Sequence, residues 1–230
     1  MQRAGCIGGG APAGAPGRSD NLCAFTKNGV VLAMDEQTKS VSALMVAIYT
    51  ELGKKEGVTY NLTLSSKGAG GGGTIYPIIT QPGDPIFDGP FNINGQRVQY
   101  WGEDATVTKT ALGIPEQDIV VYSRSAEAGM EETGMEDRGL TMFRHTKVNL
   151  FFSGDGGFTS QIQAEGNDNS STACPFYLSR TKGDYTPILK PSYGGNRKEG
   201  NTQVGNSIIF CNALAWALEK AELEGMNSNK

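Results

Sequence analysis

Short β-forming segments separated by strong turn signals constrain this chain more than any other feature. Apolar residues alternate with polar ones at Val58, Tyr60, Leu62 and Leu64, which is the period of a half-buried strand. Further β-rich segments lie at 74–80, 105–112, 118–123, 139–152, 157–164 and 174–178. Pro77 restricts the first of these to a sheet edge or a bulge.

Two Asn-Gly pairs strengthen the expectation of hairpins. Asn28-Gly29 and Asn94-Gly95 are each flanked by apolar residues, and Asn-Gly is a preferred two-residue turn because both residues tolerate positive φ. No alternation of strand, helix and strand is visible, which disfavours a parallel sheet. The pattern predicts a mainly β fold of the α+β class, built on an antiparallel β-sandwich or barrel.

A first helix is predicted at about 38–53. Asp35 or Thr38 can cap its start and Gly53 can end it. Its apolar residues recur at spacings of three and four, which places them on one face. These residues are Val41, Leu44, Met45, Ile48 and Leu52. A single stripe of this kind favours packing of the helix on a sheet.

A second helix is predicted at about 207–224, capped by Asn206 or Ser207 and closed by Gly225. The alternative is a strand over 208–211 followed by a helix that starts at Asn212. Acidic residues gather near the helix C-terminus, where the helix dipole disfavours them. We therefore expect the face that carries Trp216 and Leu218 to hold this helix by packing.

An extended arm rich in Gly and Pro is predicted at 1–21, before a single β-rich domain that spans 22–230. Residues 1–21 contain few apolar side chains, so they cannot bury enough surface to offset their ordering entropy. Such an arm is ordered only when something holds it, for example a neighbouring subunit. Residues 182–204 read as a long loop or a second arm.

The stretch LSSKGAGGGGTIYP spaces Gly68, Gly70 and Gly73 as in a dinucleotide-binding fingerprint. In such a site the glycines join a strand to a helix, whose N-terminus holds the pyrophosphate. Here β-branched residues and Pro77 follow the glycines. We therefore predict a loop, or backbone that lies close to another chain, and no cofactor.

The residue types that carry chemistry are sparse. His145 is the only histidine, so a Ser-His-Asp hydrolase would have to use it; the competing interpretation is a surface residue on the polar face of a strand. Cys6, Cys23, Cys174 and Cys211 show no CxxC spacing, which disfavours zinc. Reduced or buried thiols are the expectation, with disulfides as the alternative.

Two groups of residues are candidates for an interface. Segment 126–139 carries clustered carboxylates, for which a solvated loop, a contact to a partner or a bound cation are the possible roles. Aromatic residues could anchor a partner or stack on a sugar, and core packing is the alternative. The candidate interface residues are Trp101, Tyr185, Tyr193, Glu131, Glu132, Glu136 and Asp137.

Charge and composition reduce the number of possible partners and locations. The net charge of −4 and the absence of a long basic run argue against nucleic acid, and no run of apolar residues is long enough to span a membrane. No signal peptide is recognisable, which leaves the virion and the cytoplasm open. Leu, Ile, Val and Phe form about a fifth of the chain, a thin core that burial against partners often supplements.

These observations predict a non-enzymatic structural subunit of a large symmetric assembly, such as a virion capsid, decoration or tail protein. Its partners would be copies of itself and other subunits. The alternatives are a β-sandwich module that binds carbohydrate or a receptor, and a hydrolase that uses His145.

Overall fold

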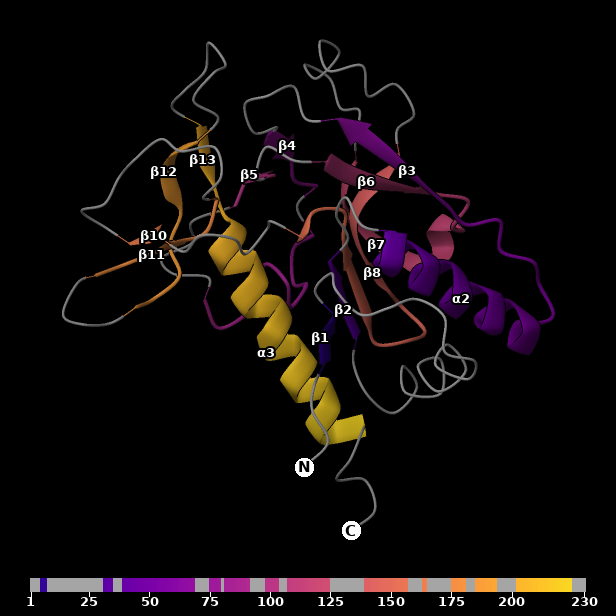
Figure 1. The fold of residues 1–230 in the computed structure, drawn as a ribbon. Coiled ribbons are helices and arrows are strands. Elements are labelled where there is room, and N and C mark those ends of the chain that lie inside the picture. The colour runs from indigo at the N-terminus through magenta and orange to yellow at the C-terminus, as the bar shows by residue number, and fades with distance from the viewer. Residues whose placement is uncertain are drawn as a thin grey trace.

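The computed structural model is mostly strands with two helices, and its main sheet curls into a half-barrel (Figure 1). It describes residues 5–7, 31–34, 39–68, 75–79, 81–91, 98–103, 107–124, 139–156, 163–164, 175–180, 185–193 and 202–224. The predicted α+β class is confirmed in this form. The finer prediction, a sandwich or a closed barrel, is not shown.

The main sheet has seven strands. Six of them follow the order β1 (Gly5–Ile7), β2 (Val31–Met34), β9 (Leu150–Ser153), β8 (Leu140–His145), β6 (Val107–Leu112) and β3 (Thr63–Gly68). The seventh, β7 (Ile119–Arg124), also pairs with β8.

The sheet is mixed, because β1, β2 and β9 run parallel to one another. The expectation of a purely antiparallel sheet was therefore wrong. Val31 pairs with Leu150, and strands so far apart in the sequence are not joined by a hairpin turn. The path of the intervening chain sets their relative direction, and no local pattern records that path.

Three pairs of short strands flank the main sheet. They are β4 (Ile75–Pro77) with β5 (Tyr100–Gly102), β10 (Gln163–Ala164) with β11 (Tyr177–Leu178), and β12 (Lys190–Tyr193) with β13 (Thr202–Val204). Pro77 lies in β4, which among the described strands pairs with β5 alone, in agreement with the predicted edge position. The predicted loop or arm at 182–204 contains the antiparallel pair β12 and β13.

Two of the predicted strand segments differ from the structure in extent. Segment 139–152 forms two strands, β8 and β9, because a turn at 146–149 separates them. The alternation that starts at Val58 does not begin a strand, since Val58 is 49% exposed and β3 starts at Thr63. Both Asn-Gly turns and residues 157–162 lie outside the described residues.

Helix α2 (Lys39–Glu56) buries the predicted stripe at Val41, Met45, Ile48 and Leu52. The predicted end at Gly53 was wrong. Gly53 lies inside the helix, where a Cβ would come within 2.5 Å of the Val58 carbonyl oxygen. The residue that follows the helix, Gly57, has φ of 70° and reverses the backbone.

Helix α3 (Asn206–Glu224) begins where the first of the two sequence interpretations placed it. The strand over 208–211 is therefore excluded. Its predicted packing face was wrong in part, because Trp216 is buried but Leu218 is 56% exposed. The buried face holds Asn206, Ser207, Ile208, Ile209, Asn212, Ala213, Trp216 and Ala217.

The two helices cover opposite faces of the sheet, and the core is divided between them (Figure 1). In β9, Phe151 packs on the α3 side while Phe152 packs on the α2 side. Met142 and Phe143 of β8 divide in the same way. The central strands are therefore apolar on both faces, as expected for a sheet between two helices.

Candidate functional site

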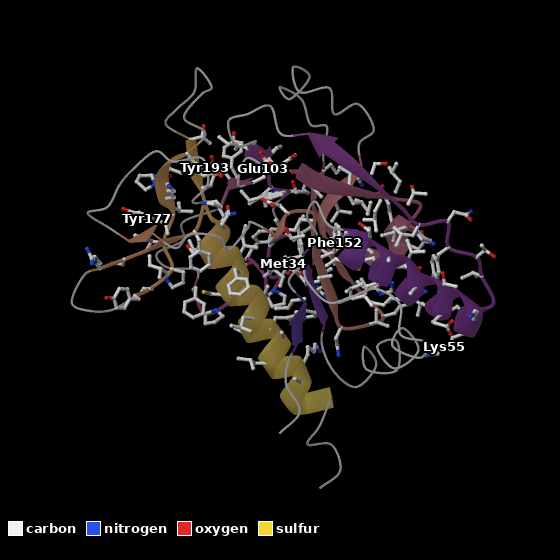
Figure 2. All side chains as sticks on the ribbon, in the orientation of Figure 1. Met34, Lys55, Glu103, Phe152, Tyr177 and Tyr193 are labelled. Carbon is white, nitrogen blue, oxygen red and sulfur yellow. The ribbon has the colours of Figure 1, made fainter. Side chains whose placement is uncertain are left out.

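The aromatic candidates for an interface occupy different environments. Trp101 is fully buried, stacks on Tyr76 with ring centroids 4.6 Å apart, and donates its indole N–H to the Ser123 hydroxyl at 3.0 Å. Tyr193 is also buried, and its hydroxyl donates to the Glu103 carbonyl (Figure 2). Tyr185 is 64% exposed. Within one chain, core packing thus accounts for Trp101 and Tyr193, and Tyr185 alone of the three is accessible.

The acidic candidates Glu131, Glu132, Glu136 and Asp137 lie outside the described residues, as does most of the predicted arm at 1–21. Within that arm, Gly5–Ile7 pairs with β2 of the same chain. Gly68 ends β3, and the next described element is β4 rather than a helix. Cys211 is a partly buried free thiol whose pKa is raised by that burial.

His145 is buried, so the interpretation of a surface residue on a polar strand face was wrong. Helix α2 covers that face, and the Tyr49 ring lies 5.8 Å from the imidazole. Nδ1 accepts the backbone N–H of Lys147 at 3.0 Å and that of Val148 at 3.3 Å. The proton of the neutral ring therefore sits on Nε2.

The Nε2 atom of His145 is buried and has no hydrogen-bond partner among the described residues. Burial lowers the pKa of His145 to about 4, although Asp118 and Glu56 oppose that shift. Neither ring nitrogen is hydrogen-bonded to a described hydroxyl or thiol. The geometry thus shows a neutral histidine that supports a turn.

A group of charged residues connects the C-terminal end of α2 to the sheet, at what we call the charged corner. The Lys147 ammonium lies 2.9 Å from Asp118 and 3.4 Å from Glu56. Its hydrogen bond to Asp118 lowers the pKa of that carboxyl, and the same bond raises the pKa of Lys147. Tyr60 donates to both carboxylates. These groups satisfy one another, which is the behaviour of a structural ion cluster.

A pocket of about 350 Å³ adjoins this corner at the C-terminal end of α2. Its lining includes Thr50, Lys54, Val58 and Tyr60. Tyr60 is shared with the charged corner, where both of its described hydrogen bonds go to carboxylates. The pocket itself offers one ammonium group and two threonine hydroxyls, without a set of convergent polar groups.

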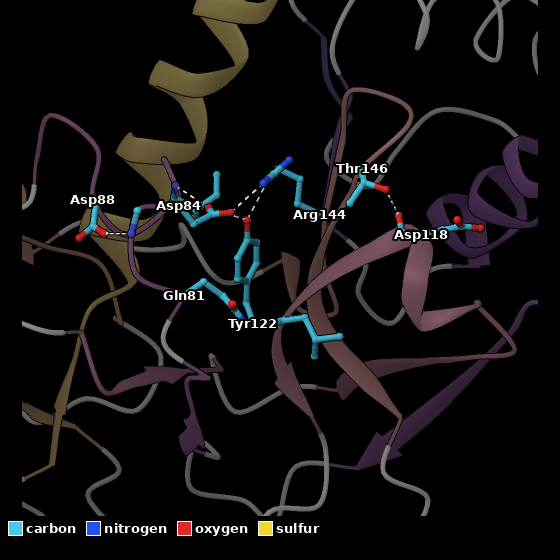
Figure 3. Close-up of polar contacts among 10 residues, drawn as sticks. Gln81, Asp84, Asp88, Asp118, Tyr122, Arg144 and Thr146 are labelled. Carbon is cyan, nitrogen blue, oxygen red and sulfur yellow. Dashed lines mark hydrogen bonds and ion pairs between the residues drawn. The ribbon is translucent and has the colours of Figure 1, made fainter.

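On the other side of the sheet, the buried Asp84 and Tyr122 form a network with the partly buried Arg144 (Figure 3). Arg144 lies 2.7 Å from Asp84 and donates through Nε to the Tyr122 hydroxyl at 3.0 Å. Tyr122 donates to Asp84 at 2.7 Å, and burial raises the pKa of Tyr122. The Arg144 guanidinium also lies over the Trp216 ring, at 5.7 Å. The network joins segment 81–91 to β7, β8 and α3.

Two buried asparagines attach α3 to segments far away in the chain. The Asn206 side chain accepts the N–H of Gly102 at 2.9 Å and donates to its carbonyl at 2.7 Å. Asn212 accepts the N–H of Phe91 at 3.0 Å and donates to the Ile86 carbonyl at 3.1 Å. Each side-chain amide thus accepts one backbone N–H and donates to one backbone carbonyl, as a residue of a paired strand does. The Asn206 side chain, one of the two predicted caps of α3, thus binds the backbone of β5.

In the described part of the chain, no group of three or more His, Cys, Asp or Glu side chains could hold a metal ion. No helix in these segments is long and apolar enough to cross a bilayer.

The outer edge of β3, the last strand in the order of the main sheet, is the candidate interface. All six residues of β3 pair with β6 in one unbroken register, from Thr63 opposite Leu112 to Gly68 opposite Val107. In an antiparallel pair, every second residue directs its N–H and C=O away from the partner strand. No described residue pairs with that outer side, and β3 lies at the rim of the sheet (Figure 1).

Four other strands in the described segments, β4, β5, β7 and β12, have edges that are covered or interrupted. Ile79 donates its N–H to the Tyr122 carbonyl of β7, which also contains register shifts. The Asn206 amide and the N–H of Gly205 cover β5. Proline interrupts β4 at Pro77 and β12 at Pro191. Such devices prevent edge-to-edge pairing, and β3 contains neither a proline nor a bulge.

Comparisons of the chain with protein-family models, with curated protein sequences and with solved structures found no match.

Sequence reasoning missed Asp84, Arg144, Asn206 and Asn212 as organising residues. Segment 81–90 reads as a turn-rich crossing, and its aspartates as turn residues. The one available signal is Asn212, a polar residue amid the apolar residues of a helix. A buried polar side chain needs a partner, but the sequence does not say which.

Proposed function

We propose that this chain is a non-enzymatic structural subunit of a large symmetric assembly, of the kind that builds a virion capsid, decoration or tail. The observation that carries the proposal is the open half-barrel, whose edge strand β3 directs backbone donors and acceptors outward along an uninterrupted strand. Backbone groups of this kind are a template for pairing with another chain.

Composition supports the same proposal. Leu, Ile, Val and Phe form about a fifth of the chain, and the described core is further divided between the two faces of one sheet. Burial against neighbouring subunits supplements cores of this kind. The sandwich or barrel predicted from the sequence is, in this proposal, completed between chains rather than within one.

The two alternatives receive less support from the geometry. A carbohydrate- or receptor-binding module would use exposed aromatic residues, and of the three named candidates Tyr185 is the accessible one. A hydrolase would need a nucleophile beside His145, whose Nδ1 instead accepts two backbone N–H groups.

Sedimentation velocity, combined with mass measurement over a wide range of concentrations, tests the proposal. We expect species larger than one chain whose population grows with concentration, and regular particles or tubes in electron micrographs of concentrated samples. A compact monomer at every concentration, with residues 1–21 freely cleaved by protease, would contradict the proposal.

A further inference from the structure

We infer that β3 pairs with β3 of a second copy of this chain, antiparallel across a twofold axis that passes beside Ser65. This inference rests on the proposed function and specifies one contact within it. The partner is a second copy because the sequence of β3, TLSSKG, is compatible with itself in this arrangement, as the following geometry shows.

A twofold axis that relates two adjacent antiparallel strands stands perpendicular to the sheet. The two strands then present the same faces on the same side. Residues directly opposite one another also share a face, so their numbers in the two copies must both be odd or both be even. The axis consequently passes beside a residue, and the candidates near the middle of β3 are Ser65 and Ser66.

Centring on Ser65 places Ser65 opposite its own copy, Thr63 opposite Lys67, and Leu64 opposite Ser66. From residue 63 to residue 67 every opposite pair then contains a hydroxyl side chain, and no two lysines face each other. Gly68 lies opposite Leu62, which precedes β3 and is already buried in its own chain. Centring on Ser66 would place Leu64 opposite Gly68, which offers no side chain to it. Like charges directly opposite are destabilising, and centring on Lys67 would create such a pair.

The burial of β3 agrees with this arrangement. Leu64 is only partly buried, although it packs against the core beneath α2. Thr63 is exposed. Pairing with a second copy continues the same core-facing side of the sheet across the axis, so that Leu64 gains a neighbour on its open side. The half-barrels of the two copies thereby share one extended sheet.

The experiment compares the dimer dissociation constants of the wild-type protein, Thr63→Lys and Thr63→Glu by sedimentation equilibrium at low salt. Thr63 is exposed in one chain, so neither change should alter the thermal unfolding temperature measured at a concentration where the chain is monomeric. In the proposed register residue 63 lies opposite Lys67 of the second copy, twice per dimer. We expect Thr63→Lys to dimerise roughly tenfold more weakly than Thr63→Glu.

Two further measurements sharpen the result. The difference between the two variants should shrink in high salt, because salt screens exposed charges. The double variant Thr63→Lys with Lys67→Glu reverses both charges and should dimerise about as tightly as Thr63→Glu.

The outcomes separate this inference from the proposed function. If the wild-type protein associates but Thr63→Lys and Thr63→Glu have equal constants, β3 pairing in this register is overturned while the assembly proposal stands. If the double variant is as weak as Thr63→Lys, the register is overturned in the same way. If the wild-type protein is a monomer at every concentration, both are overturned together.

Discussion

Helices α2 and α3 cover opposite faces of one sheet, yet different kinds of contact hold them. Helix α2 packs through an apolar stripe that contains Val41, Met45 and Ile48. Helix α3 combines apolar contacts with the buried amides of Asn206 and Asn212, which bind backbone 104 and 126 residues away, respectively. Apolar packing is not directional, whereas hydrogen bonds fix position and orientation.

The buried polar groups beside the two helices also differ in whether they have hydrogen-bond partners. On the α3 side, Asp84, Tyr122 and Arg144 satisfy one another within the core. On the α2 side, the Tyr49 hydroxyl and His145 Nε2 are buried without a described partner. The comparison indicates that the α3 side has a polar network within its core, while the α2 side has its paired charges around Lys147 at the exposed corner and depends, in its core, on packing and on the neutrality of one histidine.

The largest effect is expected from Asp84→Ala on the α3 side. This change leaves the Arg144 guanidinium, whose side chain is 19% exposed, without its carboxylate, and Tyr122 without an acceptor. Removing one member of a buried charge pair costs about 3–5 kcal/mol of unfolding free energy. Urea unfolding monitored by circular dichroism measures this loss.

The matched control is Asp88→Ala in the same segment. Asp88 is exposed and accepts the N–H of Gly83, so its loss should cost about 1 kcal/mol. Equal losses for the two aspartate variants would show that the network does not contribute beyond local turn bonding.

The next largest effect is expected from Asn212→Leu. The new side chain has a similar size but leaves the N–H of Phe91 and the carbonyl of Ile86 without their partner. Each buried unsatisfied group costs about 1–3 kcal/mol, so we expect the unfolding free energy to fall by about 3 kcal/mol. Glu219→Leu, at an exposed position of the same helix, should change it by less than about 0.5 kcal/mol. A neutral or stabilising Asn212→Leu would refute a special role for the amide.

On the α2 side the expected effect depends on pH. The pKa of His145 is about 4 in the folded chain and about 6.5 in an unfolded chain. The unfolded chain therefore binds the extra proton first, and stability falls as the pH drops from about 6.5 towards 4. Between pH 7 and pH 4.5 the loss due to His145 should be about 2 kcal/mol.

His145→Asn tests this linkage, because the Asn oxygen can accept the backbone N–H that Nδ1 accepts and has no titrating group. The variant should lose about 2 kcal/mol less than the wild-type protein between those two pH values, measured by urea unfolding at each. Asp118 and Glu56 are present in both proteins, so their own titration cancels to first order. Identical pH dependence in the two proteins would exclude His145 as its source.

The smallest effects are expected at exposed apolar residues of the two helices. Val46 on α2 is 40% exposed and Leu218 on α3 is 56% exposed. Substitution of either by Ser should change the unfolding free energy of the single chain by less than about 0.5 kcal/mol. A larger loss for Leu218→Ser than for Val46→Ser, measured by thermal unfolding of dilute protein, would show that the outer side of α3 also contributes packing.

Local patterns predicted several elements well. The stripe of α2 was visible because one face of that helix lies on the sheet and the opposite face is open. Strand β6 starts two residues after the start of the predicted segment 105–112 and ends with it. Strand β7 is displaced by one residue from the predicted segment 118–123. The position of β4 as an edge followed from Pro77, because proline lacks the N–H that a central strand donates.

Other features could not be predicted because they depend on which distant segment of the chain packs against a residue. Alternation indicates the buried side of a strand only when one face is open, and in β8 both faces are covered. This is why His145 was expected at the surface. The buried face of α3 was misjudged because Asn212 lies at its centre, and its partners belong to a segment that local patterns did not place beside α3.

The sequence by itself determined where the two helices lie, to within three residues at each end, and that the class is α+β. Those features depend on local propensity and on periodicity over a few residues. Tertiary structure alone decided the parallel pairing of β2 with β9, the pairing of Asp84 with Arg144 across 60 positions, and the position of β3 at the end of the strand order. Each of these depends on which distant segments meet, and the free energy of such contacts has no counterpart in any local stretch of residues.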